Sequence, residues 1–391
     1  MNISVKRHVT SIGAILVLAV CGQGAPTALT SQAEASQAPA ASAEKFDLGA
    51  LVAAAKKEPP LTTLNNSGVV KDLATNFTAK YGIKVNGTKA DSATQVQQVS
   101  REVQSGNVKL GVLSIEDGAL VEARLIPQRF VDNWVPPDML NSIPKEWQNP
   151  LVQIWDAKVV AYNPEAYGAC PINNIWDLTD PKWRGKVALR DPLDTPEEIT
   201  WFSWLTTDDN ARKLAAAYQQ RYGNALQTRE KNAGYEFIVR LAANQPIVTK
   251  SDNDSASSVG APGQKEAPVG IMSLGKFSEA PPQGEKLAPC KSIRPWIGYA
   301  YPRYAVIVHN TPSPNAAKLY VHYLMTAEGA APTINQHGGF SANLDVAPGR
   351  NEHLGPREFW EKNLIFLTPG GNDRAWQMRE RLSDLWRLNR K

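Results

Sequence analysis

Short metal-binding and catalytic motifs are missing from this sequence. It has three Cys and five His in 391 residues. The histidines show no His-x-x-x-His or His-Glu-x-x-His spacing, and there is neither a Cys-x-x-Cys pair nor a Gly-x-Ser-x-Gly elbow. Hydrolase and metalloenzyme chemistry therefore lacks a recognisable set of residues.

Long runs of one charge and long apolar runs are also missing. The 42 Lys and Arg and 38 Asp and Glu give a formal net charge of +4, with no run of five or more like charges. Such a dilute charge predicts no binding to nucleic acid. The longest apolar stretch, residues 12–21, is too short to cross a bilayer. The length and the 42% apolar content instead indicate two or three globular domains.

The N-terminus has the layout of a secretory signal. Lys6 and Arg7 precede the apolar residues 12–20, and small residues follow. We therefore expect a signal peptide over residues 1–21, a tether over 22–45, and a periplasmic or extracellular location. Residues 18–21 resemble a bacterial lipobox, but Val20 stands where Gly, Ala or Ser is usual. Lipidation of Cys21, with anchoring to the membrane, and cleavage after residue 35 or 43 both stay open.

Two cysteines lie in the body of the exported chain. Cys170 and Cys290 are each next to a proline, in predicted loops. An even pair in an oxidising compartment predicts a disulfide. Two unpaired buried thiols are the alternative, since a bridge requires the two Cα atoms to lie within about 7 Å.

Helix and strand signals alternate from the start of the mature chain. Asp47 precedes an amphipathic stretch, and the patterns continue as a strand at 61–64, a helix at 69–81 and a strand at 83–85. A helix capped by Ser92 and a strand at 108–114 follow. This βαβαβ order predicts a parallel sheet.

Polar loops follow two of these strands. In parallel sheets, ligands bind beyond the carboxyl ends of the strands, where helix N-termini offer free N–H groups. The candidates are Asn65, Asn66, Ser67, Gly68, Ser114 and Asp117. Ordinary turn and cap chemistry is the alternative for each residue.

Two longer segments resemble a known family. Residues 158–164 with 175–192, which include Trp176-Asp177-Leu178 and Trp183-Arg184-Gly185, are similar to bacterial extracellular solute-binding proteins of ABC importers. Residues 313–324, followed by Glu328-Gly329, resemble the late helix of the same superfamily. The likeness is greatest to the branch named for ferric iron, whose relatives also take polyamines, thiamine and phosphorylated or phosphonate solutes.

The resemblance implies a type II periplasmic-binding-protein fold. In this α/β fold, two Rossmann-like lobes are joined by hinge strands, with a ligand cleft between them. We expect residues 46–157 and 298–345 to form the first lobe, and residues 158–297 and 346–391 the second. The crossings are expected near 159–162 and 299–308. The C-terminal 40 residues depart from the family pattern, and we expect them to pack as helices against a lobe.

Further cleft candidates come from the second lobe and the crossing. They lie at the start of a predicted helix, after predicted strands, and in the crossing itself: Thr195, Glu197, Ser251, Asp252, Asn253, Ser273, Tyr299 and Tyr301. A well-made helix cap, a solvated loop and hinge packing, which would also involve Tyr304, are their respective alternatives.

Iron is the first solute to weigh, because the resemblance is to ferric binders. Those proteins carry an adjacent Tyr pair after the apolar strand, but residues 269–276 contain no Tyr. We therefore favour a small organic or phosphorylated solute, with ferric iron as the alternative. Residues 270–276 also imitate a P-loop, but Phe277 stands where Ser or Thr should be.

The sequence thus predicts a monomeric binding protein. We expect no catalysis, no cofactor, no resident metal and no nucleic-acid partner, and we expect a membrane permease to receive the solute. A surface scaffold or adhesion lipoprotein and an exported hydrolase are the alternatives from other classes.

Overall fold

The computed structural model describes residues 46–278, 284–348 and 355–390, which belong to one unit spanning 46–391. The predicted signal peptide, the predicted tether and Cys21 lie outside the described residues. Within them, no helix has the length and apolar character needed to span a membrane.

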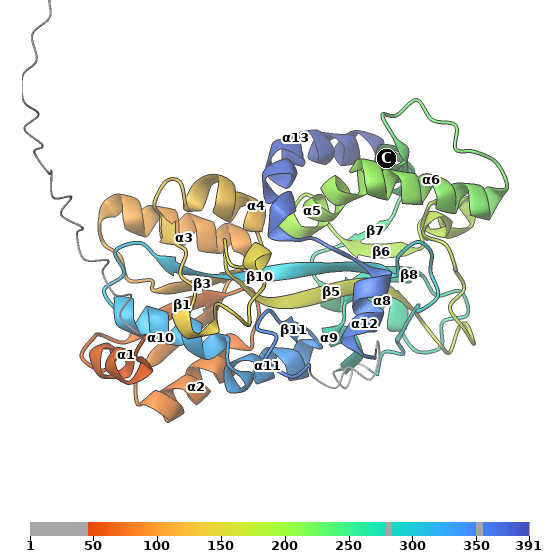
Figure 1. Ribbon diagram of the computed structural model, residues 1–391. Coiled ribbons are helices and arrows are strands. Elements are labelled where there is room, and N and C mark those ends of the chain that lie inside the picture. The colour runs from red at the N-terminus through yellow and green to blue at the C-terminus, as the bar shows by residue number, and fades with distance from the viewer. Residues whose placement is uncertain (1–45, 279–283, 349–354, 391) are drawn as a thin grey trace, which may run out of the picture. The chain divides into compact units, whose positions relative to one another are not determined.

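One mixed sheet runs through the described residues (Figure 1). Its twelve strands are β1 (Leu61–Asn65), β2 (Val85–Lys89), β3 (Val112–Ile115), β4 (Val131–Asp132), β5 (Val152–Tyr162), β6 (Val187–Arg190), β7 (Ile247–Thr249), β8 (Val269–Ser273), β9 (Ala288–Pro289), β10 (Gly298–Val308), β11 (Phe340–Ser341) and β12 (Leu364–Phe366). The main order is β2-β1-β3-β10-β5-β8-β6-β7, with β4 and β12 paired to β10, and β9 and β11 paired to β5.

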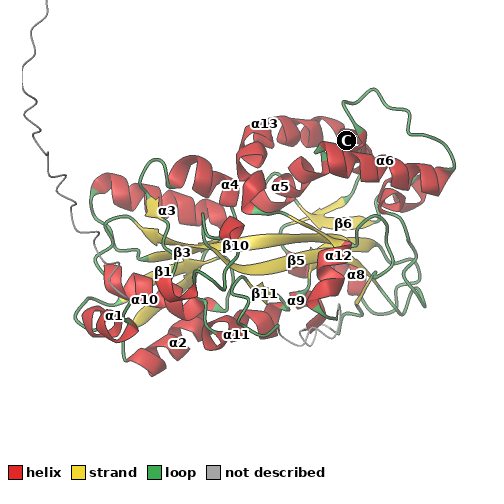
Figure 2. Ribbon diagram, viewed as in Figure 1, coloured by secondary structure: helices red, strands yellow, loops and turns green. Residues whose placement is uncertain are grey.

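Helices lie on both sides of the sheet (Figure 2). The α-helices are α1 (Leu48–Ala55), α2 (Val70–Tyr81), α3 (Ser92–Ser105), α4 (Gly118–Leu120), α5 (Pro196–Leu205), α6 (Asp208–Tyr222), α7 (Ala233–Ala243), α8 (Asp252–Gly260), α9 (Gly275–Ser278), α10 (Pro314–Leu324), α11 (Ala327–His337), α12 (Arg357–Asn363) and α13 (Asn372–Asn389). Shorter helical turns are η1 (Val121–Leu125), η2 (Pro137–Met139), η3 (Lys145–Trp147), η4 (Ile175–Thr179), η5 (Pro181–Trp183) and η6 (Pro369–Gly371).

The predicted βαβαβ order of the first half is confirmed. Strand β1 pairs in parallel with both β2 and β3. Asp47 caps α1 by accepting a hydrogen bond from the Ala50 amide, and α2 ends at Gly82, whose φ of 69° is left-handed. Three details of the prediction were wrong. Both β2 and β3 begin later than predicted, and Asp91, rather than Ser92, caps α3 through its carboxylate.

The second half is also parallel, and it runs the opposite way. Strand β6 pairs in parallel with β7 and β8, whereas β10 is antiparallel to both β3 and β5. Strand β3 ends at Ile115, opposite Tyr304 of β10, and β8 ends at Ser273, opposite Lys158, which itself pairs with Tyr299. The carboxyl ends of the two parallel halves therefore point toward each other across residues 299–304 of β10.

The two faces of the central β5–β10 ladder differ in character. Lys158 is opposite Tyr299 and Asp156 is opposite Tyr301, so these side chains share one face with Arg303. On the other face, Trp155 packs its ring 5.2 Å from those of Trp147 and Phe366. One face belongs to the apolar core, whereas the other carries buried charge.

The disulfide prediction is confirmed, because Cys170 and Cys290 are bridged with their Cα atoms 5.3 Å apart. The C-terminal helices pack on the rest of the unit, as expected. Helix α13 buries Leu382 and Trp386 and contacts α5 and α7 on one side and α4 and η1 on the other. The proposed lobe boundaries stay a prediction, and α13 contacts elements that we assigned to each lobe.

Candidate ligand-binding site

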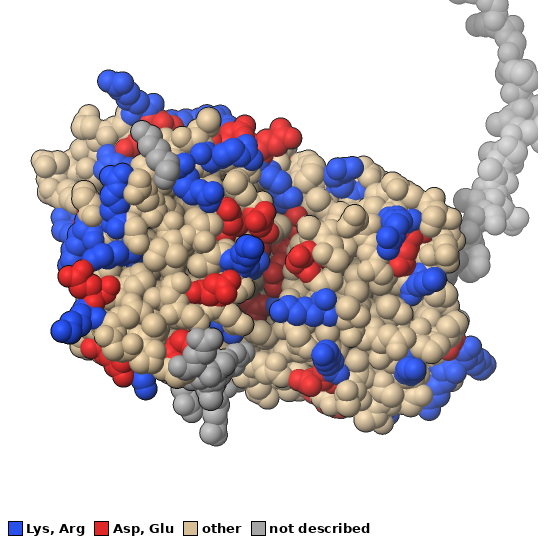
Figure 3. Space-filling view, turned by 180° about the vertical axis from the view of Figure 1, so that it is seen from behind, with Lys and Arg blue, Asp and Glu red and all other residues tan. Residues whose placement is uncertain are grey.

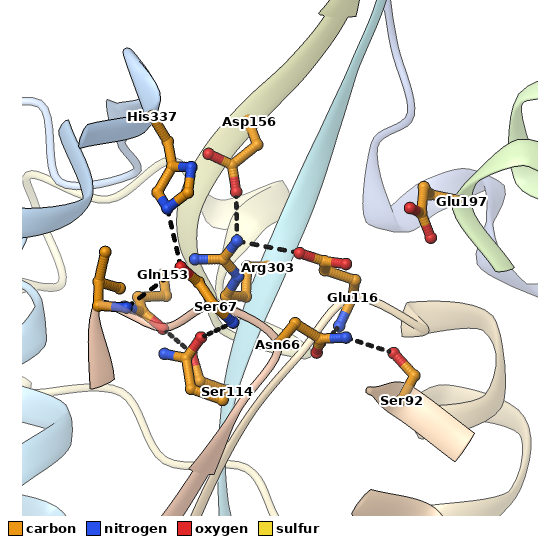
Figure 4. A network of polar contacts seen from close by, with 12 residues as sticks. Asn66, Ser67, Ser92, Ser114, Glu116, Gln153, Asp156, Glu197, Arg303 and His337 are labelled. Carbon is orange, nitrogen blue, oxygen red and sulfur yellow. Dashed lines mark hydrogen bonds and ion pairs between the residues drawn. The ribbon is translucent and has the colours of Figure 1, made fainter. Parts of the chain in front are cut away.

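An arginine from β10 organises the charges of the first half. The Arg303 Nη2 donates to Glu116 Oε1 at 2.9 Å and to Asp156 Oδ2 at 2.7 Å (Figure 4). Glu116 directly follows β3, and its backbone amide donates to the side chain of Asn66 after β1. Two loops and two strands thus position this group. One guanidinium nitrogen thus donates hydrogen bonds to both carboxylates.

A lysine from β5 organises the charges of the second half. The Lys158 Nζ lies 2.8 Å from Glu198 Oε1 and 3.1 Å from Glu197 Oε1, and its side chain is fully buried. The Arg190 Nη1 at the end of β6 also contacts Glu197 Oε1, at 3.1 Å. Both acids lie in the first turn of α5, where the N-terminal dipole stabilises negative charge.

A small cavity lies where β3 and β12 both stop pairing with β10. Strand β12 pairs with residues 298–300 and β3 with residues 304–307, so residues 301–303 have neither strand beside them. The volume open to the centre of a water molecule is about 10 Å³, which is room for roughly one water. Its lining residues are Glu116, Gly118, Glu197, Thr200, Tyr301, Pro302, Tyr304, Leu367 and Asn372.

The cavity lies between the two halves of the sheet. Figure 4 shows Glu197 facing Glu116 from another part of the chain. The first follows β6 and the second follows β3. A Cβ at Gly118 would meet the Tyr304 ring at 2.2 Å, so only glycine lets α4 approach β10 so closely. In the space-filling view, Asp and Glu side chains gather in a hollow at the middle of the molecule (Figure 3).

The cavity's two glutamates have opposite electrostatic environments. Burial raises the pKa of Glu116 to about 7, with Glu197 and Asp156 adding to the rise and Arg303 opposing it. Burial also disfavours the charge of Glu197, but Lys158 and Arg190 outweigh it and lower the pKa. Glu197 is therefore held as a carboxylate, whereas Glu116 titrates near neutrality.

The tyrosines on β10 remain protonated. Burial raises the pKa of Tyr301 well above its usual value, and Glu116 and Asp156 add to the rise. Burial likewise raises the pKa of Tyr299, next to Glu198. Tyr299 also stacks on Trp201, with ring centroids 5.0 Å apart and planes at 17°. Tyr301 lines the cavity, whereas Tyr299 is packed behind it.

The first group of predicted site residues is occupied mainly by internal contacts. The side chain of Asn65 accepts from the Ser67 amide, and the Ser67 hydroxyl lies 2.8 Å from His337 Nε2. Asn66 bonds Ser92 and Gln95, and buried Ser114 donates to Gln153. Asp117 caps α4 and pairs with Arg379, while Gly68 is exposed. These residues support the loops around Glu116, and none of them lines the cavity.

The second group of predicted site residues lies partly in the cavity and partly at the starts of helices. Glu197 and Tyr301 line the cavity. Thr195 occupies the N-cap position of α5, as predicted, but its side chain makes no capping hydrogen bond, so it is not the well-made cap of the alternative reading. Ser251 caps α8, where the alternative expected a solvated loop. Exposed Asn253 accepts from Lys276, Ser273 ends β8, and Asp252 adds its charge beside Lys158.

Most of the charged residues of the site were missed. The missed residues are Glu116, Asp156, Lys158, Arg190, Glu198 and Arg303. The sequence did contain a signal for three of them. Asp156 and Lys158 occupy alternate positions of β5 and Arg303 lies in β10, and these charges interrupt strands that are otherwise largely apolar. A buried charge in a strand requires a partner on the same face.

Metal-binding capacity is limited in the parts of the chain that the structure describes. Nowhere in them do three or more His, Cys, Asp or Glu side chains gather in a way that would hold a metal ion. Oxygen atoms of Glu116 and Asp156 share one guanidinium nitrogen of Arg303, and Asp156 is opposite Tyr301 in the β5–β10 ladder.

Two parallel half-sheets that face each other across antiparallel crossing strands define a type II periplasmic-binding-protein fold. Iron-bound HitA from Pseudomonas aeruginosa matches this chain with a TM-score of 0.61 and 16% identity, over 85% of this chain and 99% of that one. AfuA from Actinobacillus pleuropneumoniae, with fructose-6-phosphate bound, gives 0.63 and 18%, over 84% and 97%. Apo ferric ion-binding protein A from Pasteurella haemolytica gives 0.62 and 17%, over 84% and 98%. These likenesses concern the fold.

Membership of a family rests on the sequence. Residues 61–339, more than half of the chain, match the model of the bacterial extracellular solute-binding proteins. The chain belongs to that family, as its motifs predicted. No curated protein matches it.

Proposed function

We propose that this protein is the exported solute-binding component of an ABC importer. It captures a small organic or phosphorylated solute between the two halves of its sheet and delivers the solute unchanged to a membrane permease. Membership of an extracellular solute-binding family supports both the location outside the cytoplasm and the role.

One observation carries the proposal. The carboxyl ends of two parallel half-sheets point at one cavity, and that cavity is lined by a glutamate from each half and by Tyr301. Ligands of open α/β sheets bind beyond the carboxyl ends of their strands. A protein with one half-sheet has one such edge, whereas this chain brings two of them together.

The crossing strands supply the hinge in this proposal. Strands β5 and β10 are the long connections between the halves, and residues 301–303 of β10 have neither β3 nor β12 beside them. With room for about one water, the cavity admits a larger solute only if the halves move apart. Residues 46–157 and 298–345 would then move against residues 158–297 and 346–391.

A binding screen with a cavity-filling variant tests this function. We expect the melting temperature of the purified protein to rise by several degrees with at least one class of solute among amines, sugars, phosphate esters and ferric salts. Thr200→Phe places a ring in the cavity and should abolish the rise, whereas Thr94→Phe on the exposed face of α3 should preserve it. Binding that persists in Thr200→Phe would contradict the site.

The same screen separates the other classes of protein. Chemical conversion of the bound compound would indicate an exported hydrolase. No stabilisation by any class of compound would favour a surface scaffold or adhesion protein.

Ferric iron is the second candidate, favoured by the hard oxygen atoms of Glu116 and Asp156, which share Arg303 on the face of the ladder that also carries Tyr301. Against it, burial and two acids keep the Tyr301 hydroxyl protonated, and no three-residue metal group occurs among the described residues. Addition of ferric citrate tests this directly. A visible tyrosinate-to-iron absorption band that is lost in Tyr301→Phe would establish iron as the solute.

A further inference from the structure

A second cavity, here called the outer cavity, lies in the second half of the molecule. Its volume is about 440 Å³, which falls within the range of small-molecule sites. It forms where the segment before η4, the end of α6 and the segment before β10 meet. Figure 1 shows α6 toward the end of the molecule that is remote from α1. Every residue that lines the outer cavity has a polar side chain: Asn173, Asn174, Gln220, Arg221, Ser292 and Arg294. None of them lines the cavity between the two halves.

Main-chain contacts fix the floor of the outer cavity. The Arg294 amide donates to the Asn173 carbonyl at 2.9 Å, and the Ile175 amide donates to the Arg294 carbonyl at 2.8 Å. Buried Asn174 caps η4 and donates through Nδ2 to the Ala217 carbonyl of α6, also at 2.9 Å. The disulfide joins the same two segments of chain. The lining residues are therefore held in place before any ligand binds, which lowers the entropy that binding costs.

Two arginines line the outer cavity, and no acid does. Arg221 uses Nε for Asp177 and Nη2 for Asp180, whereas its Nη1 has no partner among the described residues. The Arg294 side chain is exposed, and it forms neither a hydrogen bond nor an ion pair within the part of the chain that the structure describes. The outer cavity thus offers the whole Arg294 guanidinium and one nitrogen of Arg221 to an anion.

Neutral polar groups surround these arginines. The side chains of Asn173, Gln220 and Ser292 are exposed and form no hydrogen bonds with other described residues. Amide and hydroxyl groups both donate and accept hydrogen bonds, as the hydroxyl groups of a ligand do. A purely apolar ligand would gain nothing from such a lining. The outer cavity therefore suits a ligand that carries hydroxyl groups as well as negative charge.

A smaller cavity next to the first limits the charge of the ligand. It has a volume of about 200 Å³, shares Asn173 and Arg221 with the outer cavity, and adds Lys182, Asp177 and Asp180 to the charged lining. The two cavities together contain three cations and two acids, an excess of one positive charge. One carboxylate balances this excess, whereas a doubly charged phosphate exceeds it. Arginine also presents its N–H groups in a geometry that matches a carboxylate.

We infer that the outer cavity binds a small hydroxylated carboxylate, such as a sugar acid. The carboxylate lies between Arg294 and Arg221 Nη1, and the hydroxyl groups of the ligand face Asn173, Gln220 and Ser292. This site goes beyond the proposed function, because it lies outside the cavity between the halves and its occupation requires no movement of the halves.

Isothermal titration of the full-length protein tests the inference. The ligands are glucuronate, neutral glucose, hexanoate and glucose 6-phosphate, each at low and at high salt. We expect glucuronate to bind, and we expect glucose and hexanoate to bind at least about tenfold more weakly, because glucose lacks the charge and hexanoate lacks the hydroxyl groups. The affinity for glucuronate should fall as salt is added, because the arginines are accessible to solvent.

Two surface variants locate the binding. Arg294→Gln should weaken glucuronate binding about tenfold or more, which corresponds to one lost charge-assisted contact. Ser292→Phe places a ring in the outer cavity and should abolish binding. Both residues are exposed and their side chains have no partners in the described structure, so the melting temperature without ligand should not change. Arg101→Gln, on the exposed face of α3, is the matched control and should bind like the parent protein.

A variant of the cavity between the halves separates the two sites. Thr200→Phe should leave glucuronate binding unchanged. Binding that is lost in Thr200→Phe but kept in Arg294→Gln and Ser292→Phe would place glucuronate between the halves and overturn the inference. Tighter binding of glucose 6-phosphate than of glucuronate to the outer cavity would overturn the choice of a carboxylate. Failure of glucuronate to bind would overturn the outer site and leave the proposed solute-binding function standing.

Discussion

Glu116 and Glu197 are the same kind of residue on opposite sides of one cavity, and the protein treats them differently. Glu197 receives Lys158 and Arg190, which lower its pKa in spite of burial. Glu116 has only a share of Arg303, and burial raises its pKa to about 7. Burial raises the pKa of both glutamates, so the difference between their pKa values comes from the ratio of cations to acids around each one.

This contrast assigns different tasks to the two halves. In the Lys158 group, Lys158 pairs with Glu197 and Glu198 and Arg190 pairs with Glu197, and these contacts hold α5 against β5 and β6. The Arg303 group contains an acid, Glu116, that burial makes costly to ionise. We therefore expect substitutions in the second half mainly to reduce stability, and substitutions in the first half mainly to alter ligand binding and pH dependence.

Removal of Lys158 should have the largest effect on stability. Lys158→Met leaves Glu198 without its cation and Glu197 with Arg190 alone, all in a fully buried position. Breaking a buried ion pair in this way costs about 3 to 5 kcal/mol. The free energy of unfolding from urea titration measures it. Lys80→Met, which breaks a largely exposed pair with Glu328, is the control and should change little. If Lys158→Met and Lys80→Met lowered the free energy of unfolding equally, the Lys158 group would have no special role in stability.

Glu197→Gln should come next, with a smaller loss. The amide oxygen still accepts one hydrogen bond, and Lys158 retains Glu198 at 2.8 Å. Losing charge-assisted bonds to two cations costs about 2 to 3 kcal/mol. The same urea titration checks this. A stability equal to that of the parent protein would show that Glu198 and Asp252 suffice to hold Lys158.

Glu116→Gln should act in the opposite direction. The raised pKa means that folded protein binds more protons than unfolded protein between pH 4.5 and about 7, so stability falls as the pH rises through that window. Glutamine does not ionise. The variant should therefore match the parent at low pH and exceed it by about 3 kcal/mol above neutrality, since each pKa unit is worth about 1.4 kcal/mol.

Melting temperatures of both proteins across this pH range, without ligand, test the prediction. Glu102→Gln would be a poor control, because its carboxylate accepts two backbone amides. Glu146→Gln is suitable, because Glu146 is exposed. A parallel pH profile for Glu116→Gln and the parent would show that Glu116 is not the titrating group.

The fold was largely predictable from the sequence because its signals are local. Periodicity, caps and breakers identified the βαβαβ start, and the resemblance of residues 313–324 to the family's late helix predicted α10. Family motifs supplied the crossing strands. The errors occurred at the starts of β2 and β3, where sheet pairing rather than propensity decides which residues count as strand.

The site was less predictable, for a physical reason. Turn-forming Asn, Ser and Gly mark loops equally well whether or not a ligand is near, so residues such as Asn65 and Ser114 were selected although their side chains bond internally. The charged residues of the site come from segments more than a hundred residues apart in the sequence, as do Asp156 and Arg303. Only the antiparallel register of β5 and β10 brings these onto one face.

The smallest predicted effect concerns the C-terminal helix, which contacts both halves. Arg379 of α13 donates to Asp117 at 2.9 Å, next to the cavity loop that carries Glu116. The Arg379 side chain is partly exposed, so Arg379→Gln should cost only about 1 kcal/mol in urea titration. Arg387→Gln, which breaks an exposed pair with Asp384 on the same helix, should have no measurable effect. If the Arg379 contact instead holds the halves together, its loss should speed solute association far more than it lowers stability, and stopped-flow binding would reveal that difference.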